Sequence, residues 1–431
     1  MKPMLVPVIV FIVSLVFIVW KPRGVHEAFV ALSGMLILFA AGLLKPEDAG
    51  YIWGFVWNAT FSLIGIMLFT SLLDQNGFFR WAALHIVRGF HQRPVMLFIG
   101  LSLLGAFITL FFNNDGSILI MVPIVLEVAA LLKLSRKGSL AYLIGIGFMA
   151  DTASTPLMMS NLTNILTADF FRISFAEYAS YMLLPGLAAV AATAAVTAAM
   201  FRRTIVNEQS RPQAAELFPA PETAIESTGL FKWSWAVIIV MMAGYLGAER
   251  MGVPVAAIAI GCAAVQWLLS AILIKIDFKT TLLKAPWLII VFALSMNLIV
   301  YSLHIHGAAA WLPSLLQATT EGSELAGIVG SGVLFALLAS IANNLPAVLI
   351  SSLAIEQING PSYLPYASLL GTSVGAKLTP IGSLATLLWM GLIARGGVSI
   401  SWREYMKYGL LLTFPILIAA LAVLWIVICI I

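Results

Sequence analysis

Long uninterrupted apolar runs dominate this sequence, from residues 4–20 near its beginning to 408–431 at its end. A helix needs about 20 apolar residues to cross a bilayer, whereas the strands of outer-membrane barrels alternate apolar and polar residues. Only 10% of the residues are charged, against about 25% in soluble domains. The sequence therefore predicts an all-α polytopic membrane protein, with the lipid bilayer as a partner. The net charge of +4 is assigned to loops, so no nucleic-acid partner is expected.

The apolar runs form two sets that resemble each other, separated by the one sizeable polar segment, residues 202–232. Three pairs of motifs recur 230 or 224 positions apart: Gly77 and Gly307, Asn113-Asn114 and Asn343-Asn344, and Thr155-Pro156 and Thr379-Pro380. Such spacing indicates an internal duplication. We expect a first repeat at 1–201, a cytoplasmic linker at 202–232 and a second repeat at 233–431.

The distribution of Lys and Arg predicts the topology, because these residues favour cytoplasmic loops. If the runs 95–112 and 116–132 are the two arms of a re-entrant hairpin, the basic loops all fall on one side of the membrane. The same holds for 325–341 and 345–358 in the second half. Each half then has five crossings and one hairpin, and the odd number inverts the second half relative to the first. We expect about ten transmembrane helices, two opposed re-entrant hairpins and both termini in the periplasm.

Four polar clusters interrupt the apolar runs, and polar groups inside a membrane are expensive enough to be functional candidates. Two clusters, 113–117 and 343–346, have the composition of turns and are expected to be the hairpin tips. The other two, 151–164 and 377–386, contain Pro156 and Pro380 within long runs. Proline opens the hydrogen-bond ladder of a helix, so these segments predict two broken helices that face the tips.

The repeat places one acid, Asp151, opposite one base, Lys377. Such a pair can titrate in turn, which is what coupling to protons requires. A static ion pair that only fixes packing is the alternative. Asp115 is the second candidate proton carrier, and its alternative role is to cap the second arm of its hairpin.

Motifs for other chemistries are absent from the sequence. It contains no GxxxxGK[ST] loop, no HExxH or GxSxG motif and no group of closely spaced cysteines. An intramembrane enzyme is not excluded by composition, but no nucleophile with a nearby base stands out, so we expect a transporter with no cofactor and no bound metal. Its energy must come from an ion gradient or from a separate ATPase subunit.

Five segments together resemble the ArsB arsenite/antimonite efflux permease family of the ion transporter superfamily. They are VWNATFSLIGIMLFTSLLDQNGFFRWAALHI, FFNNDGSILIMVPIVL, MADTASTPLMMSNLTNILTADFF, IANNLPAVLISSLAI and AKLTPIGSLATLLWM, and the resemblance runs from about Val25 to Phe414. It implies an inner-membrane protein that exchanges arsenite and antimonite, as neutral trivalent hydroxides, for protons. A cytoplasmic ArsA-type ATPase docks on some members. One departure is Asn113, which stands where relatives are expected to have alanine.

A neutral trihydroxide needs hydrogen-bond donors and acceptors more than an opposite charge. The side chains expected to bind the substrate are Asn114, Asp115, Ser160, Asn161, Thr163, Asn343, Asn344, Thr379 and Ser383. Those expected to couple protons are Asp151, Asp115 and Lys377. Cys262 and Cys429 lie in separate runs away from all four clusters, so recognition by thiols is not expected. The two hairpins and the broken helices are expected to move against the other helices in an alternating-access cycle.

Three other functions remain open at this stage. A sodium/proton antiporter of the NhaD type belongs to the same superfamily, and carboxylates with asparagine carbonyls can also hold a hard cation. A dicarboxylate carrier would need a positive side chain to grip its substrate, and no arginine lies in a predicted cluster. A passive channel for neutral solutes would show no uphill transport.

Overall fold

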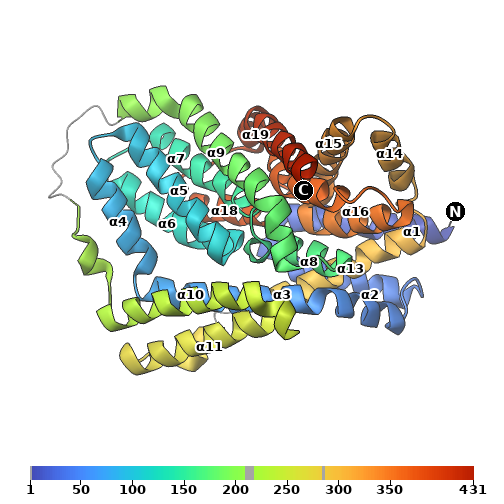
Figure 1. Cartoon of the computed structure of the whole chain (residues 1–431), viewed down its shortest axis with the longest axis horizontal. Coiled ribbons are helices and arrows are strands. Elements are labelled where there is room, and N and C mark those ends of the chain that lie inside the picture. The colour runs from blue at the N-terminus through green and yellow to red at the C-terminus, as the bar shows by residue number, and fades with distance from the viewer. Residues whose placement is uncertain (1, 209–217, 284–286) are drawn as a thin grey trace.

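The computed structural model describes residues 2–208, 218–283 and 287–431 (Figure 1), and all regular secondary structure among them is helical. Nine helices in these ranges are long and apolar enough to cross a membrane. The predicted all-α polytopic class is confirmed. The helices of the first half are α1 (Lys2–Trp20), α2 (Glu27–Ala40), α3 (Pro46–Gln75), α4 (Phe78–Phe90), α5 (Pro94–Phe112), α6 (Asn114–Leu131), α7 (Arg136–Thr152), α8 (Leu162–Phe171) and α9 (Phe175–Glu208).

The second half repeats much of this order. Its helices are α10 (Thr228–Met251), α11 (Val255–Leu273), α12 (Phe278–Leu283), α13 (Leu288–Ile305), α14 (Trp311–Thr320), α15 (Glu324–Ala342), α16 (Asn344–Ile358), α17 (Leu364–Val374), α18 (Leu384–Arg395) and α19 (Trp402–Ile430). Because α9 continues to Glu208 and α10 begins at Thr228, both ends of the polar segment 202–232 are helical. Its middle, including Arg211 and Glu216, lies outside the described residues.

A single asparagine joins the two arms of each predicted hairpin. Asn113 links α5 to α6 with φ +111°, and Asn343 links α15 to α16 with φ +76°. With ψ of +147° and +150°, both residues lie outside the left-handed helical region, in backbone conformations that residues with a side chain rarely adopt. The asparagine side chain caps the helix that follows. The Oδ1 atom of Asn113 accepts the backbone N–H of Asp115 at 2.6 Å, and that of Asn343 accepts the N–H of Leu345 at 3.3 Å. The same residue type therefore ends one arm and starts the other in both hairpins.

Two helical runs are broken where the sequence places proline. The helix α7 ends at Thr152, a short 3-10 turn follows at Met158–Ser160, and α8 begins at Leu162. In the second half a 3-10 turn at Gly375–Leu378 follows α17, and extended residues lead to α18. Extended backbone at these points leaves peptide groups free to bond to the hairpin tips.

Contacts between the halves bring these elements together. The second arm of each hairpin packs against the broken helix of the other half, α6 against α18 and α16 against α8. Elsewhere α9 packs against α19, α2 against α13, and α3 against α11. In Figure 1, α3, α10 and α11 run alongside one another at one long edge of the molecule. The hairpins and broken helices thus form an interdigitated core surrounded by longer helices.

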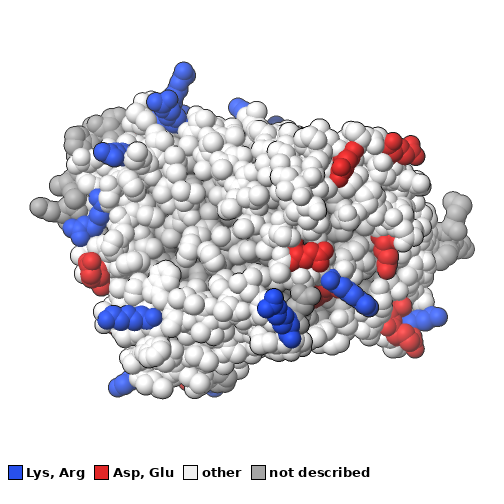
Figure 2. All heavy atoms as spheres, in the orientation of Figure 1, with Lys and Arg blue, Asp and Glu red and all other residues white. Residues whose placement is uncertain are grey.

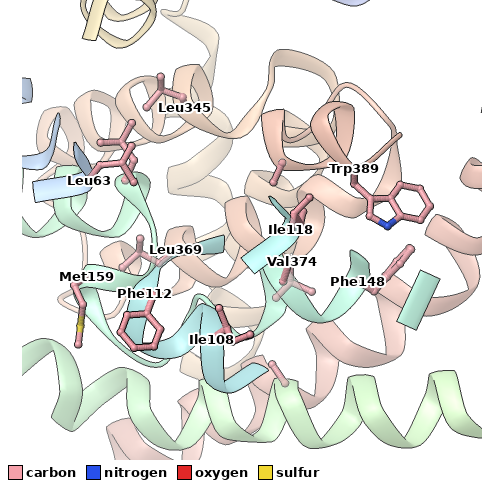
Figure 3. Packing of buried hydrophobic residues seen from close by; sticks show 14 of the residues in the cluster. Leu63, Ile108, Phe112, Ile118, Phe148, Met159, Leu345, Leu369, Val374 and Trp389 are labelled. Carbon is pink, nitrogen blue, oxygen red and sulfur yellow. The ribbon is translucent and has the colours of Figure 1, made fainter. Parts of the chain in front are cut away.

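Large side chains fill the space between these elements, as Figure 3 shows around Phe112, Phe148 and Trp389. The indole N–H of Trp389 on α18 donates to the carbonyl oxygen of Leu143 on α7 at 3.0 Å. A Cβ atom at Gly147 would lie only 2.9 Å from the indole nitrogen, so glycine is needed there. The contact fixes α18 of one half against α7 of the other.

Charged side chains are sparse on the face shown in Figure 2. Most Lys and Arg lie toward the left end, which carries α4, and most Asp and Glu lie toward the right end, where other Lys and Arg side chains lie among them. The broad surface between the ends is almost uncharged, as expected of a surface that contacts lipid.

Candidate functional site

The tip of the first hairpin and both helix breaks meet at the carboxylate of Asp151. Its Oδ1 atom accepts a hydrogen bond from Nδ2 of Asn114 at 2.8 Å and a longer one from Oγ of Ser383 at 3.4 Å. Asn114 belongs to the hairpin tip, Asp151 to the end of α7, and Ser383 to the break before α18. One carboxylate therefore connects three elements from both halves of the chain.

Lys377 forms an ion pair with the other oxygen of the same carboxylate. The Nζ atom lies 2.8 Å from Oδ2 of Asp151, and both side chains are at most 2% exposed. The same ammonium donates to Oγ1 of Thr386 at 3.0 Å and lies 5.8 Å from the ring centre of Phe148. A buried pair of this kind is tolerated because each charge is neutralised and hydrogen-bonded, and removing one partner leaves the other exposed to a low dielectric.

The tip of the second hairpin is bound to the break in its own half by backbone groups. The backbone N–H of Asn344 donates to the carbonyl oxygen of Gly382 at 2.8 Å, and Nδ2 of Asn343 donates to that of Ile381, also at 2.8 Å. The hydroxyl of Thr379 donates to the carbonyl oxygen of Ser340 at 2.5 Å. The extended backbone around Pro380 thus supplies the acceptors that hold this tip.

A small cavity lies where the four clusters meet. It has a volume of about 30 Å³ and room for about two waters. Six of the residues predicted to bind substrate line it: Asn114, Asp115, Asn161, Thr163, Asn344 and Ser383. The apolar part of the lining includes Ile289, Phe292 and Leu384. We call this hollow the inner cavity.

The other three predicted residues lie beside the inner cavity without lining it. The hydroxyl of Ser160 donates to the carbonyl oxygen of Leu110 at 2.5 Å, while Asn343 and Thr379 make the backbone contacts described above. Thr163, which does line the inner cavity, has a buried hydroxyl with no hydrogen-bond partner among the described residues. An unpartnered hydroxyl in a cavity wall is available to a ligand.

A larger hollow, here called the vestibule, adjoins the inner cavity. Its volume is about 430 Å³, and the two hollows share Asp115, Ile289, Phe292 and Leu384 in their linings. The half-buried carboxylate of Asp115 accepts no hydrogen bond and forms no ion pair with the described residues. That carboxylate is therefore open to the vestibule, while Asp151 is enclosed.

The sequence did not indicate two polar residues in the lining of the vestibule, His26 and Glu27. They stand at the start of α2, where Glu27 pairs with Lys21 at 3.0 Å. Within a sequence, a charged residue at the start of an apolar helix indicates only a helix end, so no signal placed them near Asp115.

Neither cysteine lines any of these hollows. Cys262 is buried on α11 and Cys429 is exposed on α19, and both are free thiols. The described residues also contain no group of three His, Cys, Asp or Glu side chains that could hold a metal ion. The chemistry of the inner cavity is that of amide, hydroxyl and carboxyl groups.

A sequence profile of the ArsB family, described as arsenical pump membrane protein, matches residues 6–428. The chain belongs to the ArsB family. Among its ArsB relatives, the arsenical pump membrane protein of Escherichia coli K12 is 37% identical and that of Yersinia enterocolitica 38% identical. Both alignments cover 96% of this chain and 97% of the relative. A putative arsenical pump membrane protein of Bacillus subtilis is 28% identical over 92% of this chain and 93% of its own. The resemblance predicted from the five segments is confirmed, and ArsB is a family of transporters and not of enzymes.

The architecture also has a counterpart among solved structures. The crystal structure of the YdaH transporter from Alcanivorax borkumensis matches with a TM-score of 0.57, over 97% of this chain and 98% of that one. The sequences are 15% identical, so this likeness concerns the fold alone.

Proposed function

We propose that this ArsB-family transporter exports arsenite and antimonite, as neutral trivalent hydroxides, from the cytoplasm across the inner membrane in exchange for protons. The family supports arsenic efflux, and the sequence lacks a nucleotide-binding loop that would allow the chain to use ATP by itself. An ArsA-type ATPase remains an optional partner.

The lining of the inner cavity fits such a substrate. Thr163 offers an unpartnered hydroxyl and Asn344 an amide donor and acceptor. The amides of Asn114 and Asn161 and the hydroxyl of Ser383 are bonded within the protein and would become available when the tips and breaks separate. A trihydroxide has three O–H donors and oxygen acceptors, so it can bond to these groups without a counter-charge. A space for about two waters is smaller than this substrate. Binding therefore requires the tips and breaks to separate, as expected in an alternating-access cycle.

One observation carries the proposal for proton coupling: the Asp151 carboxylate holds Lys377 through one oxygen and Asn114 through the other. Protonation would weaken the ion pair and change the hydrogen bonding of the hairpin tip at the same time. The charge state of one residue would then control whether the two halves stay in contact. Asp115, facing the vestibule, is the second carrier, and Lys377 is the positive partner of Asp151 in the buried ion pair.

The orientation in the membrane follows from charge. Lys and Arg near α4 would face the cytoplasm. The termini would then lie in the periplasm, the linker 202–232 in the cytoplasm, and the halves 1–201 and 233–431 in opposite orientations. The matching glycines Gly77 and Gly307, which both have φ +77°, support the internal repeat.

The test is arsenite uptake into everted membrane vesicles energised by respiration, with and without a protonophore. We expect the wild type to accumulate arsenite, the protonophore to abolish accumulation, and Asp151→Asn to lower uptake at least tenfold. Glu47→Gln, which changes an exposed carboxylate remote from the cavity, serves as the control. Sodium-driven proton movement without arsenite uptake would reassign the protein to sodium/proton antiport. Arsenite equilibration that never exceeds the outside concentration would make it a passive channel.

A further inference from the structure

A third hollow opens at the surface beside α6, and we call it the groove. Its volume is about 330 Å³, and it lies between α6, the end of α3 and the start of α4. An ion pair between Arg80 on α4 and Glu127 on α6 stands at its rim, together with the exposed Asp74. The groove therefore has charged groups at one end.

The groove and the vestibule share one residue, Leu119, which is 41% exposed. Asp115, Leu119, Pro123 and Glu127 follow one another at intervals of four residues on α6, and residues spaced in this way share one face of a helix. This face runs from the charged rim at Glu127 to the carboxylate of Asp115. The groove, the vestibule and the inner cavity are therefore consecutive, joined first at Leu119 and then at Phe292 and Leu384.

Pro123 gives this face a further polar group. A helical residue at this position would donate its backbone N–H to the carbonyl oxygen of Leu119, four residues earlier, but proline has no N–H. The Leu119 carbonyl thus loses its regular helical partner at the point where the groove meets the vestibule. An acceptor without that partner is suited to a ligand whose outer groups are hydroxyl donors.

We infer that the α6 face is the access route by which the neutral hydroxide reaches Asp115 from the cytoplasm, with the carbonyl of Leu119 as its first docking point. This inference rests on the proposed function and adds a place outside the inner cavity. The substrate first bonds to the backbone carbonyl of Leu119 and then to the carboxylate of Asp115. Phe292 and Leu384, which lie between the vestibule and the inner cavity, must move apart before the substrate can enter the inner cavity.

The experiment uses single cysteines in the full-length Cys262→Ser/Cys429→Ser protein. Leu119→Cys is the test variant, and Gln92→Cys is the control, since Gln92 is exposed in the basic loop between α4 and α5 and lines none of the three hollows. A membrane-impermeant maleimide is applied to everted vesicles, which present the cytoplasmic face, and to right-side-out vesicles. Arsenite uptake is then measured in the everted vesicles.

We expect Leu119→Cys and Gln92→Cys to be labelled in everted vesicles only. Labelling should lower the initial uptake rate of Leu119→Cys at least tenfold and leave uptake by Gln92→Cys unchanged. Failure of Leu119→Cys to label, or full uptake after labelling, overturns the route. Absence of uptake by the unmodified wild type contradicts the proposed function instead, and labelling at Leu119 still reports whether the groove is open to water.

A second variant tests the docking point without a bulky group. Pro123→Ala restores an N–H that can bond to the Leu119 carbonyl. We expect the arsenite concentration for half-maximal uptake to rise about two- to tenfold, the value of one neutral hydrogen bond. The maximal rate and the labelling of Leu119→Cys should stay the same. An unchanged half-maximal concentration overturns the role of this carbonyl.

Discussion

The Nζ atom of Lys377 lies 2.8 Å from Oδ2 of Asp151, in an ion pair almost completely buried between two broken helices. Each residue belongs to a different half of the chain, and each is next to a break in its helix. The pair therefore joins the two halves at the point where the backbone is least regular. Such a contact can hold the halves together in one charge state and release them in another.

Removing only the base should destabilise the protein. Lys377→Met leaves the Asp151 carboxylate buried without its counter-charge, and breaking a buried pair from one side costs about 3–5 kcal/mol. We expect a lower unfolding temperature in detergent for Lys377→Met and a recovery of most of that loss in Asp151→Asn/Lys377→Met. The double variant should fold yet fail to transport. A double variant as unstable as Lys377→Met would show that the stability does not depend on charge balance.

Asp115 should matter for transport more than for folding. Its carboxylate faces the vestibule and makes no bond to another described side chain, so Asp115→Asn should change the unfolding temperature little. We expect at least a tenfold loss of proton-driven arsenite uptake in everted vesicles. Full proton-coupled exchange in both Asp115→Asn and Asp151→Asn would exclude the two carboxylates as proton carriers.

Thiols should be dispensable for transport. Cys262 and Cys429 line none of the three hollows, so neither is placed to chelate the metalloid. The Cys262→Ser/Cys429→Ser protein should keep arsenite uptake within about twofold of the wild type after correction for the amount in the membrane. The single variants separate the two positions, because Cys262 is buried and its hydroxyl replacement can affect packing. Loss of uptake at normal protein amount would contradict recognition by amides and hydroxyls.

The sequence alone predicted the helical class, the hairpin tips and the two breaks, because each depends on local chemistry. Apolar runs, Asn at a turn and Pro within a run act over a few residues. It did not predict α4 and α14, which are short and lie outside the long apolar runs. Their 13 and 10 residues carry too few apolar turns to stand out beside membrane-length helices.

The lining of the site was harder to predict. Asn343 and Asn344 are adjacent in the tip of the second hairpin, yet Asn344 lines the inner cavity and Asn343 bonds to a backbone carbonyl. Phe292 lines the inner cavity because its helix, α13, packs beside α16 and α2. The direction of a polar side chain and the approach of a distant helix depend on tertiary packing. The spacing of residues in the sequence indicates neither the direction of a side chain nor the approach of a distant helix.

The backbone break of the second half depends on a close approach between helices. A Cβ atom at Gly375 would lie 2.2 Å from Cβ of Ala336 on α15, well inside van der Waals contact. Gly375→Ala should therefore push α15 away from the break and destabilise the protein by about 1–3 kcal/mol. Gly391→Ala on α18 is the matched control, since nothing lies within 4 Å of the added methyl group. Alanine also favours a helix interior over glycine by about 0.5–1 kcal/mol. Thermal unfolding in detergent should show a lower midpoint for the first variant and an equal or higher one for the second. Equal midpoints for Gly375→Ala and the wild type would mean that α15 and the break can shift apart enough to accommodate a methyl group without loss of stability.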